Sequence, residues 1–194
     1  MEKGSTINPL ETRKPRSPWV HIAIAVVFLL ATGTAAWALI TREPVEHPPD
    51  EWMTHSSEEG AYSAKFPEAP ELSSRSPEND GPIHMATTNL SMRVYSVAWT
   101  DNLAAQIEVR GVDDVLLDAM VGGSESIGGV ITNSIELKWN GHSGREFWLD
   151  VPGGKAHYRI LAVGTRLYTL AIIHAPDFEP NHDLFFNSFV LTQS

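Results

Sequence analysis

The short motif most typical of an enzyme in this sequence is Gly141-His142-Ser143-Gly144-Arg145. It comes close to the G-x-S-x-G turn that presents a nucleophilic serine in many hydrolases, but Arg145 stands where the last glycine is required. The flanking residues indicate a strand, a turn and a second strand, whereas the hydrolase motif needs a helix after the turn. We therefore interpret Ser143 as part of a polar hairpin tip and predict no catalytic residue.

Histidine and carboxylate side chains could also do chemistry, as metal ligands. The histidines beyond the N-terminal region are never spaced i, i+4 on an expected helix, and none falls with Asp or Glu in a recognisable ligand pattern. They are His47, His55, His84, His142, His157, His174 and His182. The absence of cysteine excludes thiolate zinc sites, cysteine nucleophiles and disulfides. We predict scattered surface histidines, no metal site and no cofactor.

The element that positions the rest of the chain is an apolar run at residues 19–40, which contains no Asp, Glu, Lys or Arg. As a helix it would measure about 33 Å, enough to cross a hydrocarbon core of about 30 Å. Basic residues dominate before it and acidic residues after it, which predicts a cytoplasmic tail at residues 1–18. Trp19 and Trp37 lie near the two ends and are expected to anchor the span at the interfaces.

A cleaved signal peptide is the alternative to this anchor. Ala36-Trp37-Ala38 fits the small-x-small pattern of a cleavage site. The preceding tail and the apolar run are both longer than is usual for a signal peptide, so we favour a retained single transmembrane helix. The chain would then sit in a bacterial inner membrane, either cytoplasmic or intracytoplasmic, with its C-terminal domain in the periplasm.

Small residues line one side of the expected span. Ala31 with Ala35, and Thr32 with Ala36, are small-xxx-small pairs that let a second transmembrane helix approach closely. His21 is the ionisable side chain inside the span, one turn from its cytoplasmic end, where the ring can reach the interface. Reaching the interface is the favoured role, and a contact with a chlorophyll-type pigment is the alternative.

Residues 41–51 hold Pro44, Pro48 and Pro49 among charged side chains, which predicts a short, stiff spacer of extended polyproline geometry. Beyond the span, residues 41–194 hold 10 Lys and Arg against 22 Asp and Glu, a net charge of −12. Such a charge argues against binding of nucleic acid. The expected partners are the lipid bilayer and the subunits of an integral membrane protein complex.

Residues 52–194 read as one extracytoplasmic domain built mainly of strands. Alternating apolar residues predict strands at residues 59–67, 84–90, 93–100 and 166–174. Residues 69–82 are polar and proline-rich and are expected to form a surface loop. A three- and four-residue period predicts a helix from Gly111 to Met120 that ends at Gly122-Gly123, and a shorter helix is expected at about residues 181–189.

Two hairpins are expected in the second half of the domain. Asn140-Gly141 is a strong turn signal, but a two-residue turn there would set Ile135 opposite Glu146. We therefore expect a three-residue loop that sets Ile135 opposite Phe147. Taking Gly153-Gly154 as the next turn pairs Phe147 with Ile160.

The strand at residues 166–174 is apolar on both of its faces, so both faces of its sheet must be covered. The two expected helices supply those coverings. The predicted fold is therefore α+β: an N-terminal single transmembrane helix, then an antiparallel sheet covered by helices on both faces, an α/β/α sandwich.

Several short stretches resemble the PsbP-type domains, whose best-known members are extrinsic proteins on the lumenal face of photosystem II. The resemblance covers about residues 52–190 and lies in Trp52, residues 60–67 (Gly-Ala-Tyr-Ser-Ala-Lys-Phe-Pro), Val94-Tyr95-Ser96-Val97, Gly144-Arg145-Glu146-Phe147, Arg166-Leu167-Tyr168 and Asn187-Ser188-Phe189. It implies a PsbP-like α/β/α sandwich that docks on a membrane complex without catalysis. The retained N-terminal anchor departs from that family, and no functional residue of it can be matched here.

The favoured function is a non-catalytic, single-pass accessory or assembly subunit of a larger bacterial membrane complex. The resemblance implies a photosynthetic reaction-centre or light-harvesting complex. Trp148 should point away from Phe147 and Leu149, which makes it the best candidate for an exposed protein contact. A free-standing periplasmic binding or stress-response module is the first alternative, and an envelope hydrolase is the least favoured one.

Overall fold

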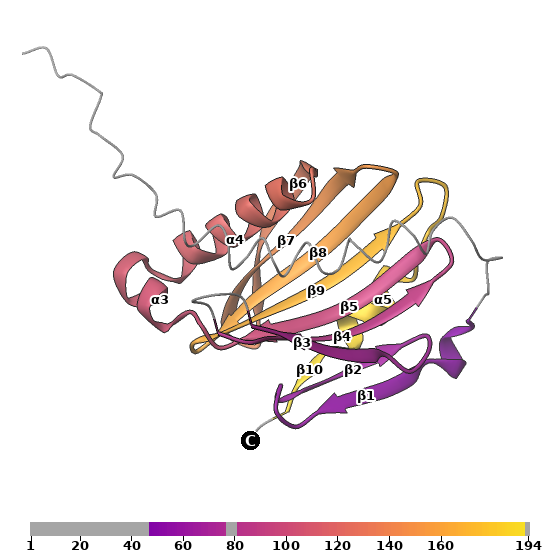
Figure 1. Cartoon of the computed structure of the whole chain (residues 1–194), viewed down its shortest axis with the longest axis horizontal. Coiled ribbons are helices and arrows are strands. Elements are labelled where there is room, and N and C mark those ends of the chain that lie inside the picture. The colour runs from indigo at the N-terminus through magenta and orange to yellow at the C-terminus, as the bar shows by residue number, and fades with distance from the viewer. Residues whose placement is uncertain (1–46, 77–80, 193–194) are drawn as a thin grey trace, which may run out of the picture.

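The computed structural model describes residues 47–76 and 81–192 as two antiparallel sheets with three α-helices (Figure 1). The larger sheet has seven strands in the order β3-β4-β5-β9-β8-β7-β6. These strands are β3 (Glu71–Arg75), β4 (Ile83–Leu90), β5 (Arg93–Thr100), β6 (Val130–Trp139), β7 (His142–Val151), β8 (Gly154–Val163) and β9 (Arg166–His174). The smaller sheet has the order β1-β2-β10, with β1 (Met53–Ser57), β2 (Tyr62–Phe66) and β10 (Val190–Leu191).

The expected membrane span at residues 19–40 lies outside the described residues, and so do Trp19, His21, the small residues at 31–36 and Trp37. None of the helices in residues 47–76 and 81–192 has the length and apolar content needed to cross a bilayer.

Strand β9 lies in the middle of the larger sheet, between β5 and β8, and nearly all of it is buried. Its side chains feed two separate cores: Leu167, Ala171 and Ile173 on one face, Tyr168, Leu170 and Ile172 on the other. The expected strand at residues 166–174 and its double burial are therefore confirmed.

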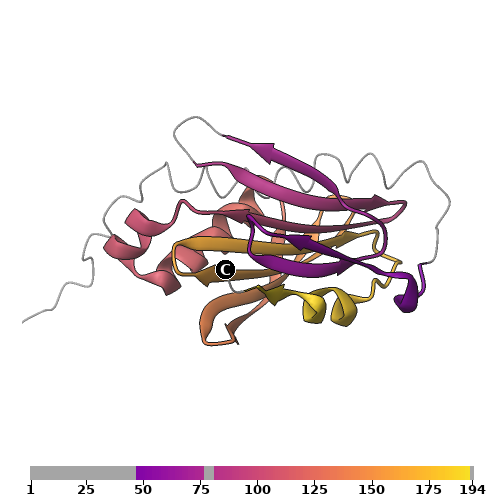
Figure 2. The same ribbon diagram turned by 90° about the horizontal axis from the view of Figure 1, so that it is seen from below.

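One face of the sheet is covered by α4 (Val112–Ser126), with α3 (Ala104–Arg110) before it (Figure 1). Val115, Leu116 and Ala119 of α4 are almost fully buried against Phe147 and Tyr158. The other face is covered by α5 (His182–Ser188) together with the smaller sheet, which Figure 2 shows in yellow and indigo. The expected second helical layer is thus shared between a short helix and three strands.

Helix α4 is longer than the sequence predicts, because it continues through Gly122 and Gly123. Both glycines are buried, so the packing of α4 on the sheet holds the helix together where glycine alone would weaken it. The chain leaves the helix near Gly128, whose φ of 64° lies in the left-handed region.

The expected three-residue loop after Trp139 is wrong. Asn140 and Gly141 both have positive φ, 49° and 86°, and form a two-residue turn that sets Ile135 opposite Glu146. Strand β6 is an edge strand and Ile135 is exposed, so the mismatch costs little. A bulge at Thr132 then corrects the register and places Ile131 opposite Leu149 in the core.

The expected turn at Gly153-Gly154 is displaced by one residue. The turn is Pro152-Gly153, with Gly153 at φ 82°, and Gly154 already belongs to β8. A side chain at Gly154 would meet the backbone oxygen of His174 at 2.2 Å, so this glycine serves close strand packing. As a result Phe147 faces Tyr158, not Ile160.

Two segments expected to be irregular or extended are structured. The expected surface loop at residues 69–82 contains the exposed edge strand β3. At the end of the expected spacer, Pro49–Glu51 form one turn of 3-10 helix, labelled η1, in place of extended polyproline geometry. The carbonyl of His47 accepts a hydrogen bond from the Trp52 indole at 3.1 Å, which ties this segment to the folded part of the chain.

Candidate functional site

A group of polar and aromatic side chains lies on the α5 face of strands β7 and β8. The Pro152-Gly153 turn sets Glu146 opposite Arg159 and Trp148 opposite His157. These four side chains share the face opposite to that of Phe147, which packs in the α4 core. The register of one hairpin therefore creates the whole group.

Glu146, His157 and Arg159 form a buried ionic cluster, with no residue more than 9% exposed. His157 Nε2 lies 2.7 Å from a Glu146 carboxylate oxygen, and one guanidinium nitrogen of Arg159 donates to both carboxylate oxygens at 3.1 and 3.2 Å. The Arg159 guanidinium also lies over the rings of Trp139 and Phe186, 4.9 Å from each centroid. Hydrogen bonds within the cluster and the two aromatic rings therefore fix the positions of these three side chains.

The charges of this cluster decide its protonation. Burial raises the pKa of the Glu146 carboxyl, but the hydrogen bond from His157 and the charge of Arg159 outweigh it, so the pKa lies below that of a free glutamate. Glu146 is thus ionised at neutral pH. Because an ionised carboxylate only accepts hydrogen bonds, His157 must donate through Nε2.

Two further histidines extend the cluster toward the surface. Nδ1 of His157 lies 2.9 Å from Nδ1 of His182, the first residue of α5. The His174 ring is 5.7 Å from that of His182, and its Nδ1 donates to the Ala175 carbonyl at 2.8 Å. The interpretation of all histidines as scattered surface residues is therefore wrong for His157, His174 and His182, which the fold brings together.

The environment keeps His182 neutral. Burial and the neighbouring His157 and His174 lower its pKa to about 4, while Glu179 and Asp183 act in the opposite direction. His182 starts a helix whose N-terminal dipole also disfavours a positive charge. At neutral pH this side chain is a weak base that forms a hydrogen bond with His157.

A cleft of about 670 Å³ opens beside this cluster. Its wall includes Trp148, whose ring stacks on that of His157 with centroids 4.5 Å apart. Thr132 and Asn133 of the edge strand β6 line one part of the cleft, and the other lining side chains are Leu149, Asp150, Lys155, Ala156, His157, His174, Glu179 and His182. Trp148 is half-buried, so one part of its ring stays available to a ligand or partner.

His157 is positioned to support the Trp148 ring and not to act as an acid or base on a ligand in the cleft. Both ring nitrogens of His157 are occupied, by Glu146 and by His182, so neither faces a substrate. The Thr132 hydroxyl donates to the Trp148 carbonyl at 3.2 Å, which links the edge strand β6 to the backbone that carries the Trp148 ring.

Within residues 47–76 and 81–192, no group of three His, Asp or Glu side chains is arranged to hold a metal ion.

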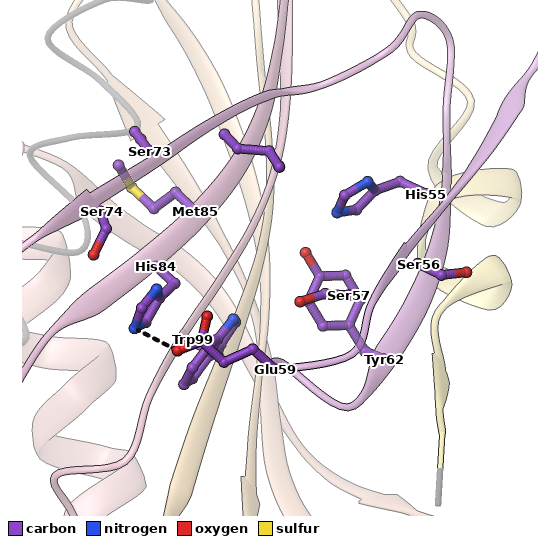
Figure 3. A pocket seen from close by; sticks show the side chains of 11 residues that line it. His55, Ser56, Ser57, Glu59, Tyr62, Ser73, Ser74, His84, Met85 and Trp99 are labelled. Carbon is purple, nitrogen blue, oxygen red and sulfur yellow. Dashed lines mark ion pairs between the residues drawn. The ribbon is translucent and has the colours of Figure 1, made fainter. Parts of the chain in front are cut away.

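A smaller cleft of about 350 Å³ lies where the smaller sheet meets β3 and β4 (Figure 3). His84 stacks on Trp99 with centroids 4.0 Å apart and lies 3.7 Å from the Glu59 carboxylate. Arg166 lies over the same indole, 4.1 Å from its centroid, and donates two hydrogen bonds to Asp101 at 2.5 and 2.7 Å. The Trp99 ring therefore has a partner on each side, which suits structure more than binding.

The hairpin motif at residues 141–145 lies apart from the Trp148 cleft, none of whose lining residues belongs to it. Ser143 follows a strand and a turn and stands in a second strand, where its hydroxyl accepts a hydrogen bond from Lys138 at 2.7 Å. Trp99, Tyr158 and Tyr168 are buried core residues. Glu146 and Arg159 were missed, although their signal is present: opposite charges that face each other once the turn is correctly placed.

No protein-family model and no curated protein matches the sequence. Among solved structures, the chain is similar to the solution structure of cyanobacterial PsbP from Synechocystis, with 12% identity over 72% of this chain and 92% of that chain and a TM-score of 0.46. It is also similar to a protein of unknown function from Pseudomonas aeruginosa, with 10% identity over 64% of this chain and 83% of that chain and a TM-score of 0.39. Function must therefore be argued from this chain's own residues.

Proposed function

We propose that the chain is a non-catalytic accessory subunit, anchored in a bacterial inner membrane by residues 19–40, that binds a larger membrane protein complex through the cleft beside Trp148. The uncharged run and its basic N-terminal flank support the anchor. The cleft supports partner binding.

The observation that carries the proposal is the way Trp148 is held. One side of its ring rests on His157, which is hydrogen-bonded to Glu146, and Glu146 is in turn held by Arg159. The rest of the Trp148 side chain is partly exposed at the cleft wall. An aromatic side chain that is packed on one side and partly exposed on the other loses little freedom on binding, which is the property of a contact hot spot. The buried ionic cluster that supports this ring costs desolvation free energy. A binding role of the ring accounts for a cluster that stability alone does not require.

Charge limits the kind of partner. The net charge of −12 over residues 41–194 favours a neutral or basic protein surface and repels anionic ones. The rim of the cleft carries Asp150 and Glu179 against Lys155, so the cleft itself follows the same preference.

The test is native electrophoresis of the full-length chain after extraction in mild detergent, with mass spectrometry of the bands. We expect the wild-type chain to migrate with a larger complex. Trp148→Ala should weaken that association about 30-fold, the loss of a hot spot of about 2 kcal/mol. Trp148→Phe should keep much of it.

The matched control is Leu117→Ala, which removes a partly exposed apolar side chain from α4 on the opposite face of the sheet. This variant should migrate as the wild type does. A wild-type chain that migrates alone, or a Trp148→Ala variant that stays fully bound, would contradict the proposal.

A second candidate is a periplasmic binding module, and the size of the cleft favours it. Sites for small molecules usually have volumes of about 300–1,000 Å³, and this cleft has about 670 Å³. Native mass spectrometry of the purified full-length chain separates the two candidates. A bound small molecule that is lost in Trp148→Ala would favour the binding module.

A further inference from the structure

Strand β6 is a long edge that no other described element covers. It runs from Val130 to Trp139 at one end of the seven-stranded sheet and is hydrogen-bonded to β7 on one side only. From Ser134 to Lys138 its side chains are exposed, apart from the half-buried Leu137. An open edge of this length offers its free backbone groups to another strand unless something blocks it.

The two-residue turn fixes which backbone groups of β6 are free. Trp139 and His142 flank the turn and form a hydrogen-bonded pair, so the N–H and C=O groups of Ile135, Leu137 and Trp139 point to β7. The same groups of the alternate residues, Glu136 and Lys138, point outward. A strand added at this edge must therefore bond to Glu136 and Lys138.

We propose that β6 pairs antiparallel with β6 of a second copy of this chain, about a two-fold axis at Leu137. In this register Glu136 of each copy lies opposite Lys138 of the other, in the hydrogen-bonded positions. Leu137 faces Leu137, and Ile135 faces Trp139. Opposite charges thus meet on one face of the joined sheet and apolar side chains meet on the other, which are the favourable cross-strand pairs.

Charge complementarity selects this register and this partner. A register centred on Ile135 would set Glu136 opposite Ser134 and Lys138 opposite Thr132, so neither charge would meet an opposite charge across the new edge. Within its own chain Glu136 lies 3.4 Å from Arg145 of β7 in either register, so only the contact to the second copy distinguishes the two. The overall negative charge of the chain opposes self-association, so the local Glu136–Lys138 pairs have to offset it. The pairing does not use the Trp148 cleft, which is lined by the other end of β6 at Thr132 and Asn133. The β6 pairing can therefore be tested independently of the proposed function.

Single-cysteine variants of the full-length chain test the register directly, because the native chain has no cysteine. Leu137→Cys should form a disulfide-linked dimer on mild oxidation, since directly opposed residues of this type lie about 4.5 Å apart between Cα atoms. Ile135→Cys is the matched control. Its Cα atoms would be about 14 Å apart along the strands, too far for a disulfide.

Charge exchange tests the chemistry of the pairing in the Leu137→Cys background. Glu136→Lys alone, or Lys138→Glu alone, should lower the yield of the linked dimer about tenfold, because like charges then face each other in two symmetric pairs. The double exchange should restore the yield. Stronger linking of Ile135→Cys than of Leu137→Cys, no linked dimer at all, or no rescue by the double exchange would overturn the proposal, provided that circular dichroism shows each variant folded.

Discussion

The two faces of the seven-stranded sheet are built from different chemistry. Under α4, the buried residues that meet Leu116 are apolar or aromatic side chains such as Phe147 and Ile160. Under α5, the apolar core that includes Phe185 and Phe186 ends at a buried carboxylate, an arginine and a histidine: Glu146, Arg159 and His157.

The difference indicates which face carries function. Burial of apolar side chains stabilises a fold. Burial of an ionic cluster costs desolvation free energy that the contacts within the cluster offset only in part. On the α4 side one carboxylate, Asp118, is also buried, but it is paired with Arg110 of α3 and lines neither of the two clefts described above. The α4 side therefore needs no explanation beyond stability. On the α5 face, the ionic cluster lies beside an open cleft and the partly exposed Trp148, which is why we propose that this face binds the partner.

The largest expected effect is the loss of stability when Glu146 is removed from the α5 face. Glu146→Ala leaves the Arg159 charge buried without its carboxylate and takes the acceptor from His157, so the free energy of unfolding should fall by about 3–5 kcal/mol. Chemical denaturation of the full-length chain, followed by tryptophan fluorescence, measures the loss.

The matched comparison is Leu116→Ala under α4, expected to cost about 3 kcal/mol through a cavity. Replacing Glu146 by Leu and Arg159 by Met together should recover most of the stability lost in Glu146→Ala, because no buried charge is then left unpaired. If the double variant is as unstable as the single one, the two faces differ less than we infer.

A drop in pH should lower the free energy of unfolding through His182, a residue of the α5 face. Its pKa is about 4 in the fold, below the value of about 6.5 for an unfolded chain. Between these values the unfolded state binds a proton that the folded state does not, so stability falls as the pH drops from 6.5 to 4.

The expected loss is about 1–2 kcal/mol, less than a fully buried imidazole would give. Thermal unfolding across this pH range measures it. His182→Gln should flatten the dependence, whereas His142→Gln, a change outside the cluster, should leave it. An unchanged slope in His182→Gln would show that another group is responsible.

The smallest effect is expected at the start of α5. The Asn181 side chain accepts a hydrogen bond from the Leu184 backbone N–H at 3.0 Å and caps the helix that carries His182. Asn181→Ala should cost about 1 kcal/mol, or about 2–4 °C in Tm. Asn181→Asp can still accept this bond and should stay close to the wild type. Equal losses in both variants would argue against the cap.

Much of the fold follows from apolar periodicity. Residues 93–100 and 166–174 form β5 and β9 as expected, because a strand buried on both faces leaves a nearly continuous apolar run, interrupted here only by Ser96 and Thr169 between the ends of the strands. The edge strand β3 was missed because its five residues are all exposed and bury no apolar pattern. The length of α4 was missed because tertiary packing overrides the weak helix propensity of Gly122 and Gly123.

The site could be found only with the correct turn. With Gly153-Gly154 as the loop, Glu146 would face Leu161 and the ionic cluster would not exist. With the Pro152-Gly153 turn, Glu146 faces Arg159. Proline sets the backbone for the first turn position and glycine for the second, so this signal was in the sequence. The contact of His182 with His157 depends on how α5 packs against the sheet, which local sequence does not encode.

The hydrogen bonds of Arg166 and Tyr168 join the two sheets. Arg166 donates to the Glu59 carbonyl at 2.9 Å, and Tyr168 donates to the Gly60 carbonyl at 2.6 Å. Both side chains belong to the central strand β9, while both carbonyls lie in the connection between β1 and β2. Detachment of the smaller sheet would therefore have to break hydrogen bonds to the central strand of the larger sheet, so side chains as well as apolar packing couple the two sheets.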